Sequence, residues 1–114
     1  MYDTDKRKLL SALCHGAIFF STTLVSIGIP IFILFVSNDP VVKENAKESI
    51  NFHLNVWVYG FIIGVLTTIS LGLLSPLFGP YFLIHWALTI WALFHVLGDD
   101  VTTAFRYPFI FRIL

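Results

Sequence analysis

Hydrophobic and charged positions are strongly segregated along this chain. Two long runs, residues 9–38 and 49–98, contain no Asp, Glu, Lys or Arg, and aliphatic and aromatic residues dominate both. The seven acidic and seven basic residues fall in three short clusters, residues 3–8, 39–48 and 99–112. A soluble domain needs a polar face on every element, whereas a bilayer span needs about 20 consecutive apolar residues. The pattern therefore predicts an all-α integral membrane bundle whose charged clusters are its solvated ends.

The same pattern, combined with turn residues, predicts a single membrane domain over residues 1–114. Residues 37–40, Ser-Asn-Asp-Pro, join turn formers to an N-cap and a proline at the first helical position. Residues 75–80 contain two prolines and a glycine, which predicts a tight turn. The expected elements are a helix over 4–22, a short helix over 27–37, a long helix over 40–74, a helix over 80–98 and a basic, aromatic tail over 105–114.

Charge sign predicts a topology, because cytoplasmic loops are enriched in Lys and Arg. If each uncharged run crosses the membrane twice, all seven basic residues face the cytoplasm; if the first run is one kinked span, they divide three against four. We therefore expect four transmembrane segments in two hairpins, with both termini cytoplasmic and segment 27–37 short or re-entrant. The expected location is a bacterial plasma membrane or a thylakoid.

Composition and motifs exclude several function classes. The net charge is zero, so nucleic acid is not an expected partner. The single cysteine, Cys14, allows no intrachain disulfide and no CxxC metal motif. There is no Ser/His/Asp arrangement, phosphate-binding glycine loop or intramembrane carboxylate pair, so we predict that the chain is not an enzyme. Its expected partners are the lipid bilayer and other integral membrane proteins.

Small residues recur every four positions on the predicted long helix, at Gly60, Gly64, Thr68 and Gly72. This spacing places them along one helix face, where small side chains let two backbones approach closely. Two interpretations stay open. The stripe packs against another helix of the same chain, or it forms an interface with a second copy or a partner membrane protein.

A polar seam runs along the last predicted helix, at His85, Thr89, His95 and Asp99. Polar groups at membrane depth usually face a bundle interior or a cavity. The seam therefore packs inward, or it forms a partner-binding groove, a solute path, or a ligand site for haem or chlorophyll. The histidines lack the HxxxH and HExxH spacings of helix-borne metal sites, so no metal and no cofactor is predicted.

A polar face begins the long helix, formed by Glu44, Lys47, Glu48, Asn51 and Asn55. Such a face is typical of a helix start that lies in the headgroup region of the bilayer. The alternative is a docking surface for a soluble or membrane partner.

Three short pieces of sequence carry a family resemblance, one in each of the first helix, the long helix and the tail. Their residues are Cys14, His15, Lys47, Glu48, Asn51, Phe52, Arg106, Tyr107 and Pro108. In this order they resemble a bacterial and cyanobacterial family of small polytopic membrane proteins of unknown function. That family is related to the roughly twenty-kilodalton subunit of the chloroplast Tic translocon. The resemblance implies a helical membrane bundle and, through the chloroplast members, a channel or scaffold in protein import.

These observations predict a non-enzymatic membrane protein that acts by protein–protein contacts. It would serve as a translocon-like component, an assembly factor or an accessory subunit of a larger membrane complex. Two alternatives stay open: a small oligomeric channel or transporter that uses the polar seam, and a pigment- or haem-binding membrane subunit.

Overall fold

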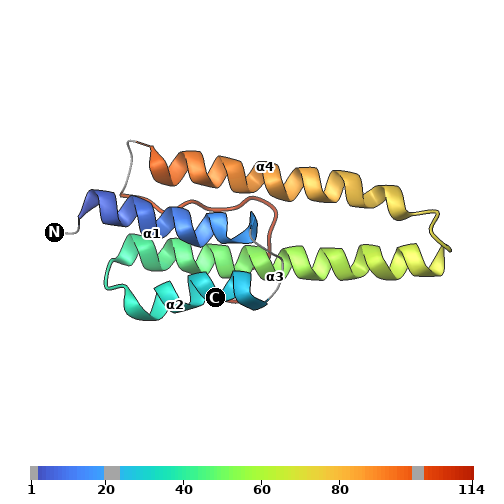
Figure 1. The fold of residues 1–114 in the computed structure, drawn as a ribbon, viewed down its shortest axis with the longest axis horizontal. Helices are drawn as coiled ribbons and strands as arrows, with labels where there is room; N and C mark the ends of the chain where they lie inside the picture. The colour runs from blue at the N-terminus through green and yellow to red at the C-terminus, as the bar shows by residue number, and fades with distance from the viewer. Residues whose placement is uncertain (1–2, 20–23, 99–101) are drawn as a thin grey trace.

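The computed structural model describes residues 3–19, 24–98 and 102–114, and every regular element in them is helical. The elements, in chain order, are α1 (Thr4–Gly16), the short 3-10 helix η1 (Ala17–Phe19), α2 (Leu24–Val36), α3 (Pro40–Ile69), a second 3-10 helix η2 (Ser75–Leu77) and α4 (Phe78–Leu97). Figure 1 shows α4 returning antiparallel to α3, with α1 and α2 beside the first part of α3. The all-α expectation is confirmed for the described residues.

Aspartates start both α1 and α3. Asp3 and Asp39 are the N-caps of these helices, each with extended backbone. The side chain of Asp39 accepts a hydrogen bond from the Val41 backbone N–H at 3.0 Å, and Pro40 takes the first helical position. Arg7 on α1 donates from Nε to Asp39 Oδ2 at 2.6 Å. This ion pair holds the starts of the two helices together.

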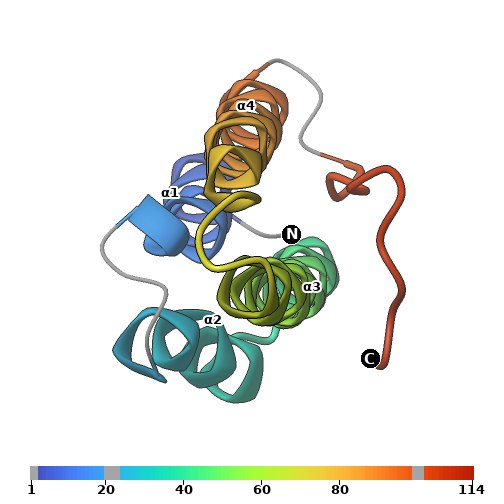
Figure 2. The same ribbon diagram turned by 90° about the vertical axis from the view of Figure 1, so that its right-hand side faces the viewer.

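The molecule has two parts that differ in thickness (Figures 1 and 2). At one end α1, α2, the first part of α3 and the last part of α4 lie together with the tail, residues 102–114; we call this the four-helix end. Residues 57–84 continue beyond it as two helices and their turn; we call this the hairpin extension. No residue from 57 to 84 is buried. The extension gives the molecule its long axis, with overall extents of 55 × 25 × 22 Å.

The interior of the four-helix end is unusually polar for a protein of this size, although it also contains apolar clusters. Its interior includes many polar residues: Ser11, His15, Ser26, Asp39, Asn45, Glu48, Ser49, Asn51, His53, Asn55, His85 and Thr89. Large apolar side chains such as Phe32 and Phe94 are exposed on α2 and α4. A bundle surrounded by lipid places its polar groups inside, because its outer surface meets hydrocarbon. The distribution therefore agrees with a membrane protein.

Two helical segments, Pro40–Ile69 and Ser75–Leu97, are long and apolar enough to cross a membrane. In contrast, α2 has 13 residues and is therefore about 20 Å long, shorter than the roughly 30 Å hydrocarbon core. Helix α1 has the same number of residues. Four full crossings are therefore not confirmed, and the cytoplasmic location of both termini stays a prediction.

Several helix ends differ from the sequence-based expectation. Helix α3 ends at Ile69, short of the expected 74, because Leu71 and Gly72 adopt positive φ angles of 55° and 91° and turn the chain. Helix α1 ends at Gly16 and passes into η1, and the expected continuation to residue 22 runs into residues 20–23, outside the described part. Helices α2 and α4 begin slightly earlier than expected, at 24 and 78.

Candidate functional site

Three segments that are far apart in the sequence meet inside the four-helix end. Helix α1 contributes His15, α3 contributes Glu48 and Phe52, and the tail contributes Tyr107. The rings of Phe52 and Tyr107 are stacked, with centroids 4.0 Å apart and planes inclined by 2°. All four side chains are buried. They belong to the three pieces of sequence that carry the family resemblance, so we call this arrangement the motif cluster.

His15 bridges α3 and the tail. Its Nε2 lies 2.8 Å from Asn45 Oδ1, and its Nδ1 lies 2.7 Å from the Tyr107 hydroxyl. An amide oxygen can only accept, so Nε2 carries the proton and Tyr107 donates to Nδ1. Asn45 Oδ1 also accepts from the backbone N–H of Phe105 at 3.0 Å. Burial lowers the pKa of His15 from 6.5 to about 4, against the opposing hydrogen bond to Asn45. The imidazole is therefore neutral at physiological pH.

Glu48 is the charged centre of the motif cluster. Its side chain is 3% exposed, and Oε2 accepts from the Tyr107 backbone N–H at 2.9 Å. Arg112 forms a bidentate pair with the same carboxylate, and its Nη2 also donates to the Tyr107 carbonyl at 2.7 Å. The hydrogen bond to Glu48 raises the pKa of Arg112. Arg106 Nη1 approaches Oε1 at 3.6 Å from the surface. One carboxylate thus fixes the middle and the end of the tail.

Two asparagines one helical turn apart on α3 bind the rest of the tail. Asn51 Oδ1 accepts from the backbone N–H of Ile113 at 2.9 Å. Asn55 binds both backbone groups of Phe111: Oδ1 accepts from its N–H at 3.2 Å, and Nδ2 donates to its carbonyl at 2.7 Å. These amides satisfy tail backbone groups much as a neighbouring strand would. The tail is therefore held along its length by side chains of one helix face.

This arrangement corrects one sequence-based interpretation. Glu48, Asn51 and Asn55 were expected on a headgroup-facing or partner-docking surface, but they are buried beneath the chain's own tail. Glu44 and Lys47 do remain at the surface, where Lys47 Nζ lies 3.4 Å from Glu44 Oε1. The polar face is therefore divided between residues buried beneath the tail and a short charged strip, Glu44 and Lys47.

Cys14 lies in a separate part of the interior, between α1 and α3. Its thiol is free and buried, and burial raises its pKa from 9.0 to about 12. Its backbone carbonyl accepts a hydrogen bond from the Ser49 hydroxyl. Nearby, His53 Nε2 lies 2.7 Å from Ser26 Oγ, which links α3 to α2. A protonated, enclosed thiol is a packing group rather than a nucleophile.

The small-residue stripe does not act as one surface. A Cβ on Gly60 would lie 2.7 Å from the Tyr81 hydroxyl oxygen, so this glycine permits the close approach of α4. Gly64 has no neighbour within 4 Å of its Cβ position, and Gly72 lies in the turn after α3. Thr68 donates from Oγ1 to the Gly64 carbonyl at 2.9 Å. Of the three glycines, Gly60 is the one whose Cβ position meets a side chain of another helix.

The polar seam of α4 is also divided. His85 and Thr89 are buried, and Thr89 Oγ1 donates to the His85 carbonyl at 2.8 Å. His95 lies further along, with Nε2 3.2 Å from the carbonyl of Thr103. Asp99 lies outside the described residues. Of the described seam residues, His85 and Thr89 therefore lie inward, whereas His95 is half-buried.

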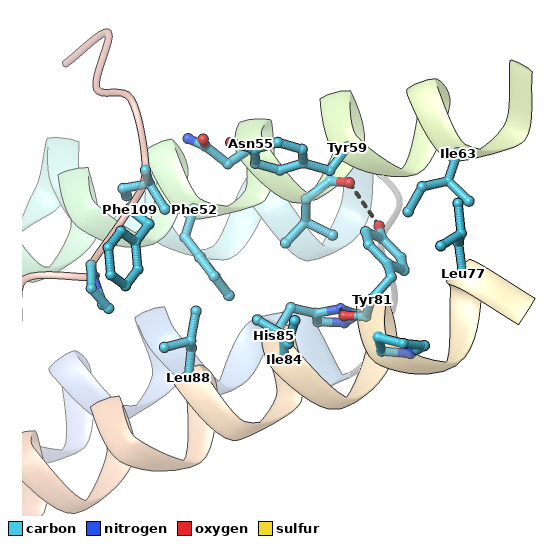
Figure 3. A pocket seen from close by; sticks show the side chains of 14 residues that line it. Phe52, Asn55, Tyr59, Ile63, Leu77, Tyr81, Ile84, His85, Leu88 and Phe109 are labelled. Carbon is cyan, nitrogen blue, oxygen red and sulfur yellow. Dashed lines mark hydrogen bonds between the residues drawn. The ribbon is translucent and has the colours of Figure 1, made fainter. Parts of the chain in front are cut away.

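A cleft of about 460 Å³ separates α3 from α4 where the two parts of the molecule meet (Figure 3). Side chains from both helices line it, and residues 108–110 of the tail, beginning with Pro108, border it. The hydroxyl of Tyr81 crosses the gap and donates to the Val56 carbonyl at 2.7 Å. Helix α4 packs mainly on α1 rather than on α3, which leaves the cleft between them.

The chemistry of the site is that of a hydrogen-bonded scaffold. Among the residues that the structure describes, no group of three or more His, Cys, Asp or Glu side chains is arranged to hold a metal ion. Each ionisable group of the motif cluster is engaged by an amide, an imidazole, a backbone group or an opposite charge. Sequence reasoning found most of these residues, Arg112 included, through the motifs, but it did not find that Arg112 pairs with Glu48 or that Asn45 binds His15.

Comparison with known proteins identifies one family. The model of the magnetosome magnetite crystal formation protein family, MamF/MmsF, matches residues 6–114. Searches of curated proteins and of solved structures found no significant match. The family is one of small bacterial membrane proteins, as the motifs indicated. The comparisons show no relation to the Tic subunit and support neither a translocon nor a protein-transport role.

Proposed function

The chain belongs to the magnetosome magnetite crystal formation protein family, and from this premise we propose that it supports crystal formation as a non-enzymatic scaffold in the magnetosome membrane. It would do so by protein–protein contacts. The observation that carries this proposal is the use of the polar groups in the motif cluster and of the asparagines beside it. Glu48, His15 and three asparagines bind one another or the tail backbone. They build a rigid end rather than a reactive site.

The contact surface that we propose consists of the charged strip and Arg106 of the neighbouring tail. Glu44, Lys47 and Arg106 have side chains that are between two-fifths and two-thirds exposed. Arg106 belongs to the tail, whereas Glu44 and Lys47 belong to α3. Because the motif cluster joins the tail to α3, it sets the distance between Arg106 and the other two side chains. Charges of both signs held in fixed positions favour a specific partner over non-specific binding. The hairpin extension, which carries no charge, would hold this surface at the membrane.

The proposal is tested in a magnetosome-forming bacterium from which its own genes of this family have been deleted. The chain is returned as wild type, as Glu48→Ala and as Glu44→Ala. We expect the wild type to partition with isolated magnetosome membranes and to restore the crystals, measured as number and size distribution by electron microscopy. Glu48→Ala should fail to restore the crystals, because this change releases the tail and Arg106. Glu44→Ala removes one surface carboxylate and leaves the tail in place. A wild-type chain in the magnetosome membrane that leaves the crystals unchanged contradicts the proposal.

The protein–protein part is tested separately. Affinity purification from those membranes in mild detergent should recover the same partner with the wild type in repeated preparations. Joint reversal of the strip, Glu44→Lys with Lys47→Glu, should remove that partner without changing the folded fraction. A wild-type chain that is recovered alone, as a monomer, contradicts action through protein contacts.

A further inference from the structure

The cleft between α3 and α4 has the size and lining of a ligand site. Its volume of about 460 Å³ lies within the range of roughly 300–1,000 Å³ found for small-molecule sites. The lining is almost wholly apolar; it includes Val56, Ile63, Ile84 and Leu88 from the two helices. Figure 3 shows these helices on opposite sides of the cleft, with Phe109 at one end. This lining suits a hydrocarbon chain.

The cleft is maintained by a built contact rather than by loose packing. Tyr81 reaches across from α4 and donates to the Val56 carbonyl, as the dashed line in Figure 3 shows. Gly60 leaves the room that the Tyr81 hydroxyl needs. The tail borders the cleft at Pro108, and the tail is itself fixed by the motif cluster. Helix spacing at the cleft is therefore set by specific contacts at both ends.

One polar group among these apolar walls lacks a partner. His85 lines the cleft and is 4% exposed. Its Nδ1 lies 3.1 Å from the Tyr81 carbonyl, which can only accept, so Nδ1 carries the proton of the neutral ring. Nε2 is then an acceptor, and it has no hydrogen-bond partner among the described residues. A buried acceptor without a donor is costly, so it favours a ligand that supplies one.

We propose that this cleft binds one membrane lipid that has a long apolar chain and a hydroxyl group, and that the hydroxyl donates to His85 Nε2. The apolar walls take the chain, and the imidazole selects the donor. The specificity rests on the lone pair of Nε2, since a chain without a donor would fill the cleft and leave this atom unpaired. The site does not depend on any role in crystal formation.

Two photoactivatable probes test the site in phosphatidylcholine vesicles that contain the purified full chain. One is hexadecanol with a diazirine in its chain, and the other is the methyl ether of the same molecule, which cannot donate. We expect hexadecanol to label cleft residues such as Ile84 and Leu88, located by mass spectrometry of the digested protein. The ether should label them about tenfold less, the effect of one unmade buried hydrogen bond.

Two variants complete the test. His85→Phe keeps a ring but removes the acceptor, so it should reduce labelling by hexadecanol to the level of the ether. Leu83→Phe changes a residue that is 69% exposed and outside the cleft, and it should label as the wild type does. If His85→Phe fails to fold, the comparison of the two probes on the wild type still tests whether the ligand must donate a hydrogen bond. Equal labelling by alcohol and ether overturns the proposal, as does labelling spread evenly over the lipid-facing surface.

Discussion

The four-helix end and the hairpin extension contain parts of the same two helices, α3 and α4, yet they are held together by different forces. In the four-helix end, buried carboxylate, imidazole and amide groups connect three segments of the chain. In the extension, where no residue is buried, Tyr81 supplies a single described hydrogen bond between the helices. Lipid is as apolar as the helix surfaces, so hydrophobic burial gives such a hairpin little cohesion.

This contrast indicates that stability and adaptability are separated along the molecule. Polar contacts in a water-poor interior are strong when every partner is satisfied and costly when one is lost. The four-helix end should therefore be rigid and sensitive to substitution. The extension should tolerate changes of side chain and small changes of helix spacing. Four experiments test or refine this comparison, from the largest expected effect to the smallest.

Loss of Glu48 should have the largest effect. Glu48→Ala leaves Arg112, which is 28% exposed, without its carboxylate and frees the tail. We expect the free energy of unfolding in detergent micelles to fall by about 3 kcal/mol, the cost of removing one member of a buried ion pair. Glu44→Ala is the matched control: its side chain is 52% exposed, and the change should stay within about 0.5 kcal/mol. Equal effects would show that the tail is not held by Glu48.

Acid should weaken the four-helix end through His15. The folded state holds the pKa of His15 at about 4, below its value of 6.5 in the unfolded chain. The unfolded state therefore binds the proton first, and stability is lost as the pH falls from about 6.5 towards 4. Between pH 7 and pH 5 we expect a loss of about 2 kcal/mol, measured by unfolding in micelles. His15→Gln should remove this part of the pH dependence, and an unchanged slope would contradict the assignment.

The hydrogen bond of Tyr81 should contribute less to the free energy of unfolding than the contacts of Glu48 and His15. Gly60→Ala places a Cβ 2.7 Å from the Tyr81 hydroxyl oxygen and displaces it from the Val56 carbonyl. We expect a loss of about 1 kcal/mol, the net value of one hydrogen bond. Gly64→Ala lies one turn further along α3 with nothing within 4 Å, and it should be neutral or slightly stabilising because alanine favours the helix. Thermal unfolding of both variants separates a local clash from a general effect of glycine replacement.

The smallest effect is expected in the extension itself. Phe61→Ala removes a ring that is exposed on α3, so the free energy of unfolding in micelles should change by less than about 0.5 kcal/mol. Phe52→Ala also removes a phenyl ring, but from the first half of α3, where the ring is buried against Tyr107. This change should lower the free energy of unfolding by about 3 kcal/mol. A similar loss in both variants would mean that the two parts do not differ in the way proposed.

The helical character and several boundaries could be predicted from the sequence. Uncharged runs require membrane helices, and Asp39 followed by Pro40 defines a helix start through backbone chemistry alone. What the polar face of α3 contacts could not be predicted in this way. A period of 3.6 residues shows that Glu48, Asn51 and Asn55 share a face, but it does not distinguish a face that meets water from one that meets a peptide backbone. Both supply hydrogen-bond partners to the same side chains.

The sequence by itself determined that this is a helical membrane protein with its charges confined to three clusters, because hydrocarbon excludes charge wherever it meets the chain. It also marked, in three short motifs, several residues of the interior of the four-helix end, among them His15, Glu48 and Tyr107. Only the tertiary structure decided that the tail covers α3 and that α3 and α4 separate around a cleft. These features depend on contacts such as Glu48 with Arg112, whose partners are distant in the chain and are brought together only by folding.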